Sequence, residues 1–299
     1  MPSNTALTVG PSIDYVVVST FNRYTHLPIR VLLAKDLVPR VFAKVFQQVG
    51  AKDDLLSYDK KGKNIPYHIT GEVKGTALVG IRYKQLWSDA PLPHNTPEHA
   101  FRVITGDFVT TDDGTGIVHT APTFGADDAV VAKQANPEVP PMLVLDEHEQ
   151  LVPLVDLQGR FRKELGSLGG KYVKNEYYDY GQAPDKSVDV EIAIRLKEEN
   201  KAFTVEKYVH SYPNCWRTDK PVLYYPLNSW FVKVSDIKER LVALNNNINW
   251  KPKSTGEGRF GNWLANANDW NLSRSRFWGI PLPIWRTEDN SETKVIGSI

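Results

Sequence analysis

Short strand-like runs at close intervals are the feature that most constrains the fold of this chain. The runs HITGEV, TALVGIRY, FRVITGDFV and GIVHTA occupy residues 68–73, 76–83, 101–109 and 116–121, with Gly or Asp-Gly between them. Such spacing is typical of a barrel or a sandwich and disfavours alternating βαβ units, which need a helix between successive strands. We therefore expect a mostly β core.

The remaining periodicity predicts peripheral helices and a second, less regular part. From about residue 210 the chain becomes dense in aromatic residues and prolines, so we expect a boundary there, between 1–210 and 211–299. The other predicted elements are strands at 4–10 and 12–20 around a Gly-Pro turn, helices at 38–51, 127–135, 187–202 and 235–247, two strands within 141–152, and a strand at 203–209.

Composition restricts the class of protein. The chain has 299 residues, 41% of them hydrophobic, and a formal net charge of +1, so a nucleic-acid partner would have to meet a local site. The single cysteine, Cys215, excludes an internal disulfide. There is no apolar run of about 20 residues and no signal peptide at the N-terminus, so we expect a soluble cytoplasmic protein without a membrane partner.

A histidine and an acid pair are the main candidates for chemistry. His119 ends an apolar run, and Asp127 and Asp128 follow after a short loop. Each has a structural reading, since His119 can hydrogen-bond within the core and Asp127 can cap the following helix. The functional hypothesis places His119 and Asp128 on two rims of one pocket. A carboxylate there binds an ammonium group, and the imidazole shapes the space beside an ester.

Other catalytic motifs are missing from the sequence. His94, His99 and His148 have neither an HExxH arrangement nor a cysteine at ligand spacing, so we expect no metal site. The absence of G-x-S-x-G, GxGxxG and phosphate-loop motifs disfavours a serine hydrolase and the common nucleotide sites. Of three short basic clusters, which usually mark solvated surface, the one at 273–279 best suits RNA contacts because aromatic residues accompany its arginines.

Five segments resemble isoleucyl-tRNA synthetases, in the same order and across essentially the whole chain. They are PSNTALTV, GTALVGIRY, GDFVTTDDGTGIVHTAPTFGADD, AIRLKEENKAFTVEKYVHSYPNCWR and NLSRSRFWGIPLPIW. Valyl- and leucyl-tRNA synthetases share the same type of editing domain. The HSYP-CWR element and the SRxRxWG element together are more similar to the isoleucyl enzymes.

The resemblance implies a fold and a division of labour. Residues 1–210 would form a β-barrel-like editing domain, the connective peptide 1 (CP1) domain, and 211–299 a mixed segment leading back to the class I catalytic core. THLP (25–28) and KPKS (251–254) do not reproduce the family's HIGH and KMSKS motifs. We therefore expect a fragment without a synthetic site, with ATP and Mg needed only by the full-length ligase. Met1 stands where the family usually has Leu and is expected to be an added start residue.

The resemblance also assigns roles to individual residues. Asp128 would bind the α-ammonium of a misattached amino acid, and His119 would line the pocket for its side chain and help to discriminate valine from isoleucine. The other substrate-binding residues would be Asn4, Gly114, Thr115, Gly116, Phe124 and Asp127, with the loop at 114–116 approaching the terminal adenosine. Editing would need no cofactor. Zinc at Cys215 is not expected, because Thr218 and Asp219 follow where zinc-bearing members have further cysteines.

The expected activity is post-transfer editing, the hydrolysis of Val-tRNA(Ile). The partners would be the acceptor end of tRNA(Ile) and the rest of the synthetase, and not DNA. In the family a threonine-rich element precedes the position of Pro2. The alternative is therefore a fragment that binds aminoacyl-adenosine or the acceptor end without turnover. A general RNA-binding barrel is disfavoured by the near-neutral charge.

Overall fold

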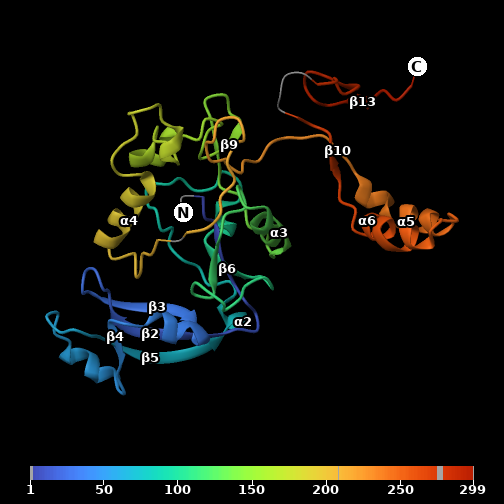
Figure 1. Ribbon diagram of the computed structural model, residues 1–299. Coiled ribbons are helices and arrows are strands. Elements are labelled where there is room, and N and C mark those ends of the chain that lie inside the picture. Colours follow the sequence, from blue (N-terminus) through green and yellow to red (C-terminus); the bar gives the residue numbers. More distant parts are fainter. Residues whose placement is uncertain (1–2, 208, 275–278, 299) are drawn as a thin grey trace. The chain divides into compact units, whose positions relative to one another are not determined.

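The computed structural model describes residues 3–207, 209–274 and 279–298, and the chain divides into two compact units, Met1–Pro226 and Leu227–Ile299 (Figure 1). The strands of the first unit are β1 Ala6–Val9, β2 Asp14–Phe21, β3 Pro28–Ala34, β4 Phe46–Gln48, β5 Ile65–Lys74, β6 Arg102–Thr105, β7 Ile117–Thr120, β8 Leu143–Leu145 and β9 Leu151–Pro153. Its α-helices are α1 Val38–Val41, α2 Gly75–Leu78, α3 Ala126–Gln134 and α4 Val188–Glu198, with short 3-10 turns between elements.

A four-stranded sheet in the order β3-β2-β5-β4 lies at one end of the first unit (Figure 1). β2 is antiparallel to β3 and β5, whereas β4 runs parallel to β5. The β-branched run in β2 buries Val16 and Val18, and these pack with Leu33 of β3 and Phe42 into one apolar cluster. Burial of this cluster stabilises the sheet.

A three-stranded sheet in the order β6-β1-β7 carries the candidate histidine. β1 is parallel to β6 and antiparallel to β7, and Leu7 lies opposite His119 in the register. The strands expected at 4–10 and 12–20 are confirmed, but they join different sheets. The hydroxyl of Tyr15 accepts a hydrogen bond from the Gly10 amide and donates one to the Gly116 carbonyl, which fixes the crossing between the sheets.

The expected barrel is not what the sheets form. Within the described residues the strands form separate small sheets, and β3 and β4 are the outer strands of the four-stranded one, so no closed barrel is present. Val9 of β1 and Val103 of β6 pack into the same apolar cluster as the four-stranded sheet, so one cluster joins the two sheets. The architecture is a mixed α/β arrangement with small sheets.

Two segments differ from the sequence-based expectation. The helix expected at 38–51 is limited to α1, and β4 follows it. The reason is that the rings of Phe42 and Phe46, whose centroids are 5.0 Å apart, enter the core from a short turn and a strand. The run at 76–83, expected to be a strand, begins as α2 and then makes only an isolated bridge between Arg82 and Arg102.

A second apolar cluster holds α4 in place. Val188, Ile192 and Leu196 project from one face of α4 and pack with residues such as Met142 and Leu154, both fully buried. The period of three to four residues is that of an amphipathic helix, as the sequence predicted for 187–202. The helices expected at 127–135 and 235–247 and the strand pair within 141–152 are also confirmed, as α3, α5 (Lys238–Asn246) and β8–β9.

The first unit continues beyond residue 210, where the composition changes. Tyr225 donates a hydrogen bond to the carbonyl of Val155, and Tyr177 donates one to that of Pro221. These contacts attach the segment up to Pro226 to the first unit. The strand expected at 203–209 is not formed by the described residues of that range, since their backbone groups contact other elements.

The described residues of the second unit form short strand pairs and two α-helices. Its elements are β10 Phe231–Val232, α5 Lys238–Asn246, α6 Gly261–Ala265, β11 Trp270–Asn271, β12 Ile284–Arg286 and β13 Thr293–Val295. β10 pairs with β11 and β12 with β13, both antiparallel. Of the basic cluster at 273–279, residues 275–278 lie outside the described residues.

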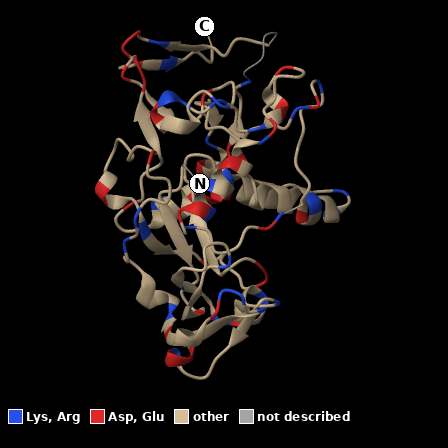
Figure 2. Ribbon diagram, turned by 90° about the vertical axis from the view of Figure 1, so that its left-hand side faces the viewer, with Lys and Arg blue, Asp and Glu red and all other residues tan. Residues whose placement is uncertain are grey.

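Charged residues of both signs are interspersed along the chain (Figure 2). This agrees with the near-zero net charge and gives no evidence for one extended basic face.

Candidate functional site

A cavity of about 880 Å³ in the first unit contains the predicted histidine. This volume lies in the range of small-molecule sites, roughly 300–1,000 Å³. Its lining includes predicted site residues and a neighbour, namely Gly114, Thr115, His119, Ala121 and Phe124. Residues of α4 and residues 201–206 also line it.

The loop before β7 depends on glycine at two positions. Gly114 and Gly116 have φ angles of +68° and +72°, a region that side chains with a Cβ rarely adopt. A Cβ on Gly116 would also lie 2.5 Å from the Cβ of Ala34. The Thr115 carbonyl between them accepts a hydrogen bond from the Ala34 amide at 2.8 Å. The loop is therefore held against the end of β3, with Gly114 and Thr115 at the cavity.

His119 lies on the cavity wall near the end of β7. The residue is exposed to solvent where it lines the cavity. Burial among protein atoms lowers the pKa of His119 below its usual 6.5, and the negative charge of Asp128 partly opposes the shift. A neutral imidazole, the form that a lowered pKa favours, can donate one hydrogen bond and accept another.

Asp128 is close enough to influence His119 but is not among the residues that line the cavity. It is the third residue of α3, and its Oδ2 accepts a 2.8 Å hydrogen bond from the amide of Ala121. The carboxylate thus closes the loop between β7 and α3. A Cβ at Gly125, the N-cap, would lie 2.7 Å from that oxygen, so the loop passes very close to the acid.

Asp127 and His119 lie on different cavities. Asp127 lines a smaller cavity of about 500 Å³, together with residues such as Arg102 and Phe108. It is also not the helix cap that the sequence suggested, because the N-cap position of α3 is Gly125 and Asp127 follows two residues later. Its remaining effect on the helix is a favourable charge in the first turn.

Asn4 uses both ends of its amide to join elements behind the cavity. Its Nδ2 donates to the carbonyls of Ala6 and Thr120 at 2.6 and 3.3 Å, and its Oδ1 accepts from the hydroxyl of Tyr83 at 2.6 Å. Burial raises the pKa of Tyr83, so this phenol remains a donor. The structure therefore places Asn4 in a structural network beside β7.

Phe124 lies in the loop that Asp128 closes. Its ring lines the cavity and contacts Tyr225 edge-on, with centroids 5.9 Å apart. It therefore joins the cavity to the second apolar cluster.

The cavity-lining residues at 201–206 were not predicted from the sequence. Residues 201–206 reach the cavity because the β2–β3 turn holds them: Asn22 donates to the Ala202 carbonyl at 2.8 Å, and Tyr24 accepts from the Val205 amide at 2.9 Å. The members of each pair are about 180 residues apart in sequence. No local pattern marks such a pairing.

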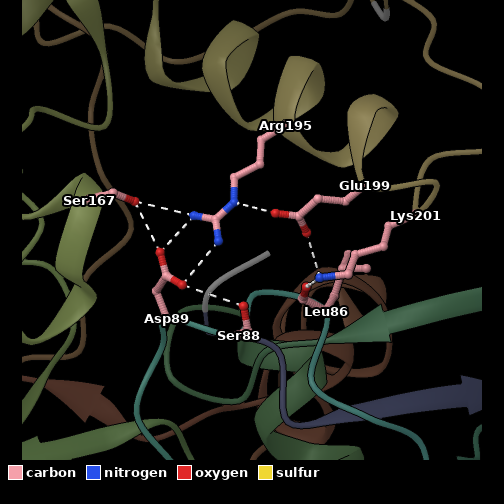
Figure 3. A network of polar contacts seen from close by, with 7 residues as sticks. All are labelled: Leu86, Ser88, Asp89, Ser167, Arg195, Glu199 and Lys201. Carbon is pink, nitrogen blue, oxygen red and sulfur yellow. Dashed lines mark hydrogen bonds and ion pairs between the residues drawn. The ribbon is translucent and has the colours of Figure 1, made fainter.

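A polar network fixes α4 to the segment that contains Asp89, 106 residues before Arg195 in the chain. Figure 3 shows Arg195 reaching from α4 to lie between Asp89 and Glu199. Its guanidinium bonds both Asp89 oxygens at 2.7 and 3.0 Å, and this contact lowers the pKa of Asp89 to about 2. Lys201 pairs with Glu199 and donates to the Leu86 carbonyl, and both Lys201 and Leu86 line the cavity. The network thus positions one cavity wall.

The described residues contain neither a cluster of metal-ligand side chains nor a membrane-spanning helix. Among residues 3–207, 209–274 and 279–298, no three His, Cys, Asp or Glu side chains gather as they would around a metal ion. In the same ranges no helix has the length and apolar character needed to cross a membrane.

Comparison with known proteins shows to which family the chain belongs. The family model described as tRNA synthetases class I (I, L, M and V) matches residues 32–299. The chain belongs to the class I tRNA synthetases. The resemblance to isoleucyl-tRNA synthetases seen in the sequence motifs is confirmed by relatives that match this synthetase chain from end to end.

Those relatives are isoleucine--tRNA ligases of three bacteria. The Cytophaga hutchinsonii protein is 57% identical over 311 residues, and those of Bacteroides fragilis and Porphyromonas gingivalis are 52% and 50% identical. In each case the alignment covers 100% of this synthetase chain but 27% of the relative. The chain therefore spans about a quarter of the length of the ligases that it matches.

Among solved structures, the crystal structure of GlLeuRS-CP1 is similar to this synthetase chain, with a TM-score of 0.37 and 15% identity. The match covers 71% of this chain and 80% of that one. A similarity at this TM-score carries no argument about the site.

Proposed function

We propose that this chain is the editing (CP1) part of an isoleucyl-tRNA synthetase and that it hydrolyses the ester of valine mischarged onto tRNA(Ile). The observation that carries the proposal is the position of His119 on the wall of a ligand-sized cavity, in a chain similar throughout to isoleucine--tRNA ligases. Residues 211–299 would lead back to the class I catalytic core. In the cytoplasm, the complete enzyme would use ATP and Mg to ligate isoleucine to tRNA(Ile).

The physical need for such a site follows from the size of one methylene group. Valine and isoleucine, the standard example, differ by a group worth only roughly 1–3 kcal/mol in an apolar pocket, so binding alone discriminates poorly. A second pocket that admits the valyl group and excludes the isoleucyl group provides the missing selectivity. The neutral imidazole of His119 would form part of the wall that sets this size.

The hydrolysis itself requires few catalytic groups from the protein. The ester is already activated, so a water molecule needs positioning more than deprotonation. A ribose hydroxyl next to the ester can assist, and no metal or covalent nucleophile is required. In this proposal Oδ2 of Asp128 holds the loop through Ala121, and its other oxygen, Oδ1, binds the α-ammonium of the substrate.

The test uses the full-length synthetase that contains this segment and measures release of valine from Val-tRNA(Ile). Asp128→Asn keeps an oxygen acceptor for the Ala121 amide but removes the charge. We expect it to lower the deacylation rate roughly 10- to 150-fold, the equivalent of one charged hydrogen bond. Asp127→Asn is the matched control, because Asp127 lies on the other cavity, and its rate should stay within about twofold of wild type.

The outcome that would reject the proposal is a wild-type deacylation rate in Asp128→Asn, or no deacylation by the unmodified enzyme. If the 299-residue chain binds a non-hydrolysable valyl-adenosine mimic while the full-length enzyme does not deacylate, the cavity is a binding site without turnover.

A further inference from the structure

Thr204 places a buried hydroxyl group in a wall of the His119 cavity. The residue lines the cavity, yet its Oγ1 is buried and has no hydrogen-bond partner among the described residues. Most buried polar groups in native structures are paired, because an unpaired one loses its hydration without compensation. An exception inside a ligand-sized cavity therefore points to a role in binding.

The backbone around Thr204 is fixed on both sides. Asn22, which is fully buried, donates to the carbonyl of Ala202, and Tyr24 accepts from the amide of Val205. The ring of Phe203 packs against both Phe42 and Phe46, with centroids 5.3 Å apart in each case. The segment is thus anchored to the core, so the main chain on both sides of Thr204 is held in place.

Rotation about χ1 can bring the hydroxyl to the cavity surface. The Oγ1 and Cγ2 atoms of threonine occupy staggered positions around the same bond, so a change of rotamer moves one toward the place of the other. The rotation removes Oγ1 from its unpaired position and offers both a donor and an acceptor to a bound molecule.

The other cavity-lining groups indicate which part of a substrate reaches Thr204. Phe124, Phe161 and Phe203 are among the residues that line the cavity, and flat nucleic-acid bases stack well on aromatic side chains. We propose that Thr204 is a substrate-binding residue whose hydroxyl turns into the cavity and hydrogen-bonds the terminal nucleoside of the aminoacylated RNA. This inference rests on the proposed function, because the ligand is the proposed editing substrate.

The test measures binding of a non-hydrolysable valyl-adenosine mimic, in which an amide replaces the ester, to the 299-residue chain by titration calorimetry. Thr204→Val keeps the shape of the side chain without the hydroxyl and should weaken binding roughly 3- to 10-fold. Thr204→Ser retains the hydroxyl and should stay within about twofold of wild type. The melting temperature of Thr204→Val should equal or exceed that of wild type, because an unpaired buried hydroxyl is removed.

Thr5 supplies a matched control. Its Oγ1 is also buried without a partner among the described residues, but Thr5 lines neither of the two cavities described above. Thr5→Val should likewise keep or raise the melting temperature and leave binding of the mimic unchanged.

Three results would overturn the inference: unchanged binding by Thr204→Val, a lowered melting temperature in that variant, or no binding of the mimic by the wild-type chain. Failure of the proposed function is distinguishable from these. Wild-type binding that weakens in Thr204→Val, without any deacylation by the full-length enzyme, keeps the inference and rejects the activity. Robust deacylation by the full-length enzyme, with unchanged binding in Thr204→Val, keeps the activity and rejects the inference.

Discussion

The Asp128 carboxylate accepts a 2.8 Å hydrogen bond from the backbone amide of Ala121, two residues beyond His119. One oxygen of the acid therefore shapes the loop that follows the imidazole. A change at Asp128 alters both a negative charge and the conformation of this loop, and the two effects have to be separated by the choice of substitution.

The structural effect of Asp128 is visible in stability alone. Asp128→Ala leaves the Ala121 amide without this acceptor and removes a favourable charge from the first turn of α3, so the chain should lose roughly 1–2 kcal/mol of unfolding free energy. Asp128→Asn should lose less than half of that. Urea unfolding of the two variants measures the difference, and equal losses would show that the hydrogen bond does not hold the loop.

The role of His119 is tested by selectivity. His119→Ala enlarges the cavity by most of an imidazole ring, so the full-length enzyme should begin to hydrolyse correctly charged Ile-tRNA(Ile), by roughly 10-fold or more over wild type. Deacylation rates of Ile-tRNA(Ile) and Val-tRNA(Ile) are compared for the same preparation. An unchanged ratio of the two rates would remove His119 from the discriminating wall.

The two glycines of the 114–116 loop form a natural pair for a strain experiment. In Gly116→Ala a positive φ combines with a clash against Ala34, so we expect a loss of roughly 2 kcal/mol or more. Gly114 has a similar φ, but no atom lies within 4 Å of its added Cβ, so Gly114→Ala should lose only about 1 kcal/mol. Denaturant unfolding compares them, and a larger loss for Gly114→Ala would contradict the packing described for the loop.

The contact between Asp89 and Arg195 predicts a dependence of stability on pH. Because the pKa of Asp89 falls from 3.8 to about 2 in the folded chain, the contact stabilises fully above pH 3.8 and is lost as the pH falls toward about 2. Asp89→Asn should therefore be less stable than wild type near neutral pH, with a difference that shrinks below pH 3.8. Unfolding of both proteins across this range is the measurement. A stability difference between the two proteins that does not change with pH would show that the ionised Asp89 carboxylate is not the source of the stabilisation.

Local periodicity predicted the elements whose own side chains make the pattern. α4 has its apolar face at the expected spacing, and β7 and α3 flank the loop near the expected boundaries. The segment at 38–51 shows the limit: Phe42 and Phe46 satisfy helical spacing, but pairing of β4 with β5 and burial of both rings determine the outcome. The local pattern of a single sequence does not show whether helical spacing or strand pairing and burial will determine the structure.

For the site, the sequence named some of the residues that line the cavity and missed others, and their role in editing stays a prediction. His119, Gly114, Thr115 and Phe124 were named from motifs and do line it, whereas Asp127 faces another cavity and Asn4 is used in a structural network. The wall at 201–206 depends on hydrogen bonds from Asn22 and Tyr24, which only the folded chain brings near. The place of the wall is therefore a tertiary property.

The most direct measurement of the central claim is a crystal structure of the 299-residue chain with a non-hydrolysable valyl-adenosine mimic. We expect the valyl group in the cavity beside His119 and its ammonium group within hydrogen-bond distance of Oδ1 of Asp128, roughly 2.7–3.2 Å. A mimic bound at another site, or an ammonium group that contacts no atom of Asp128, would contradict the account.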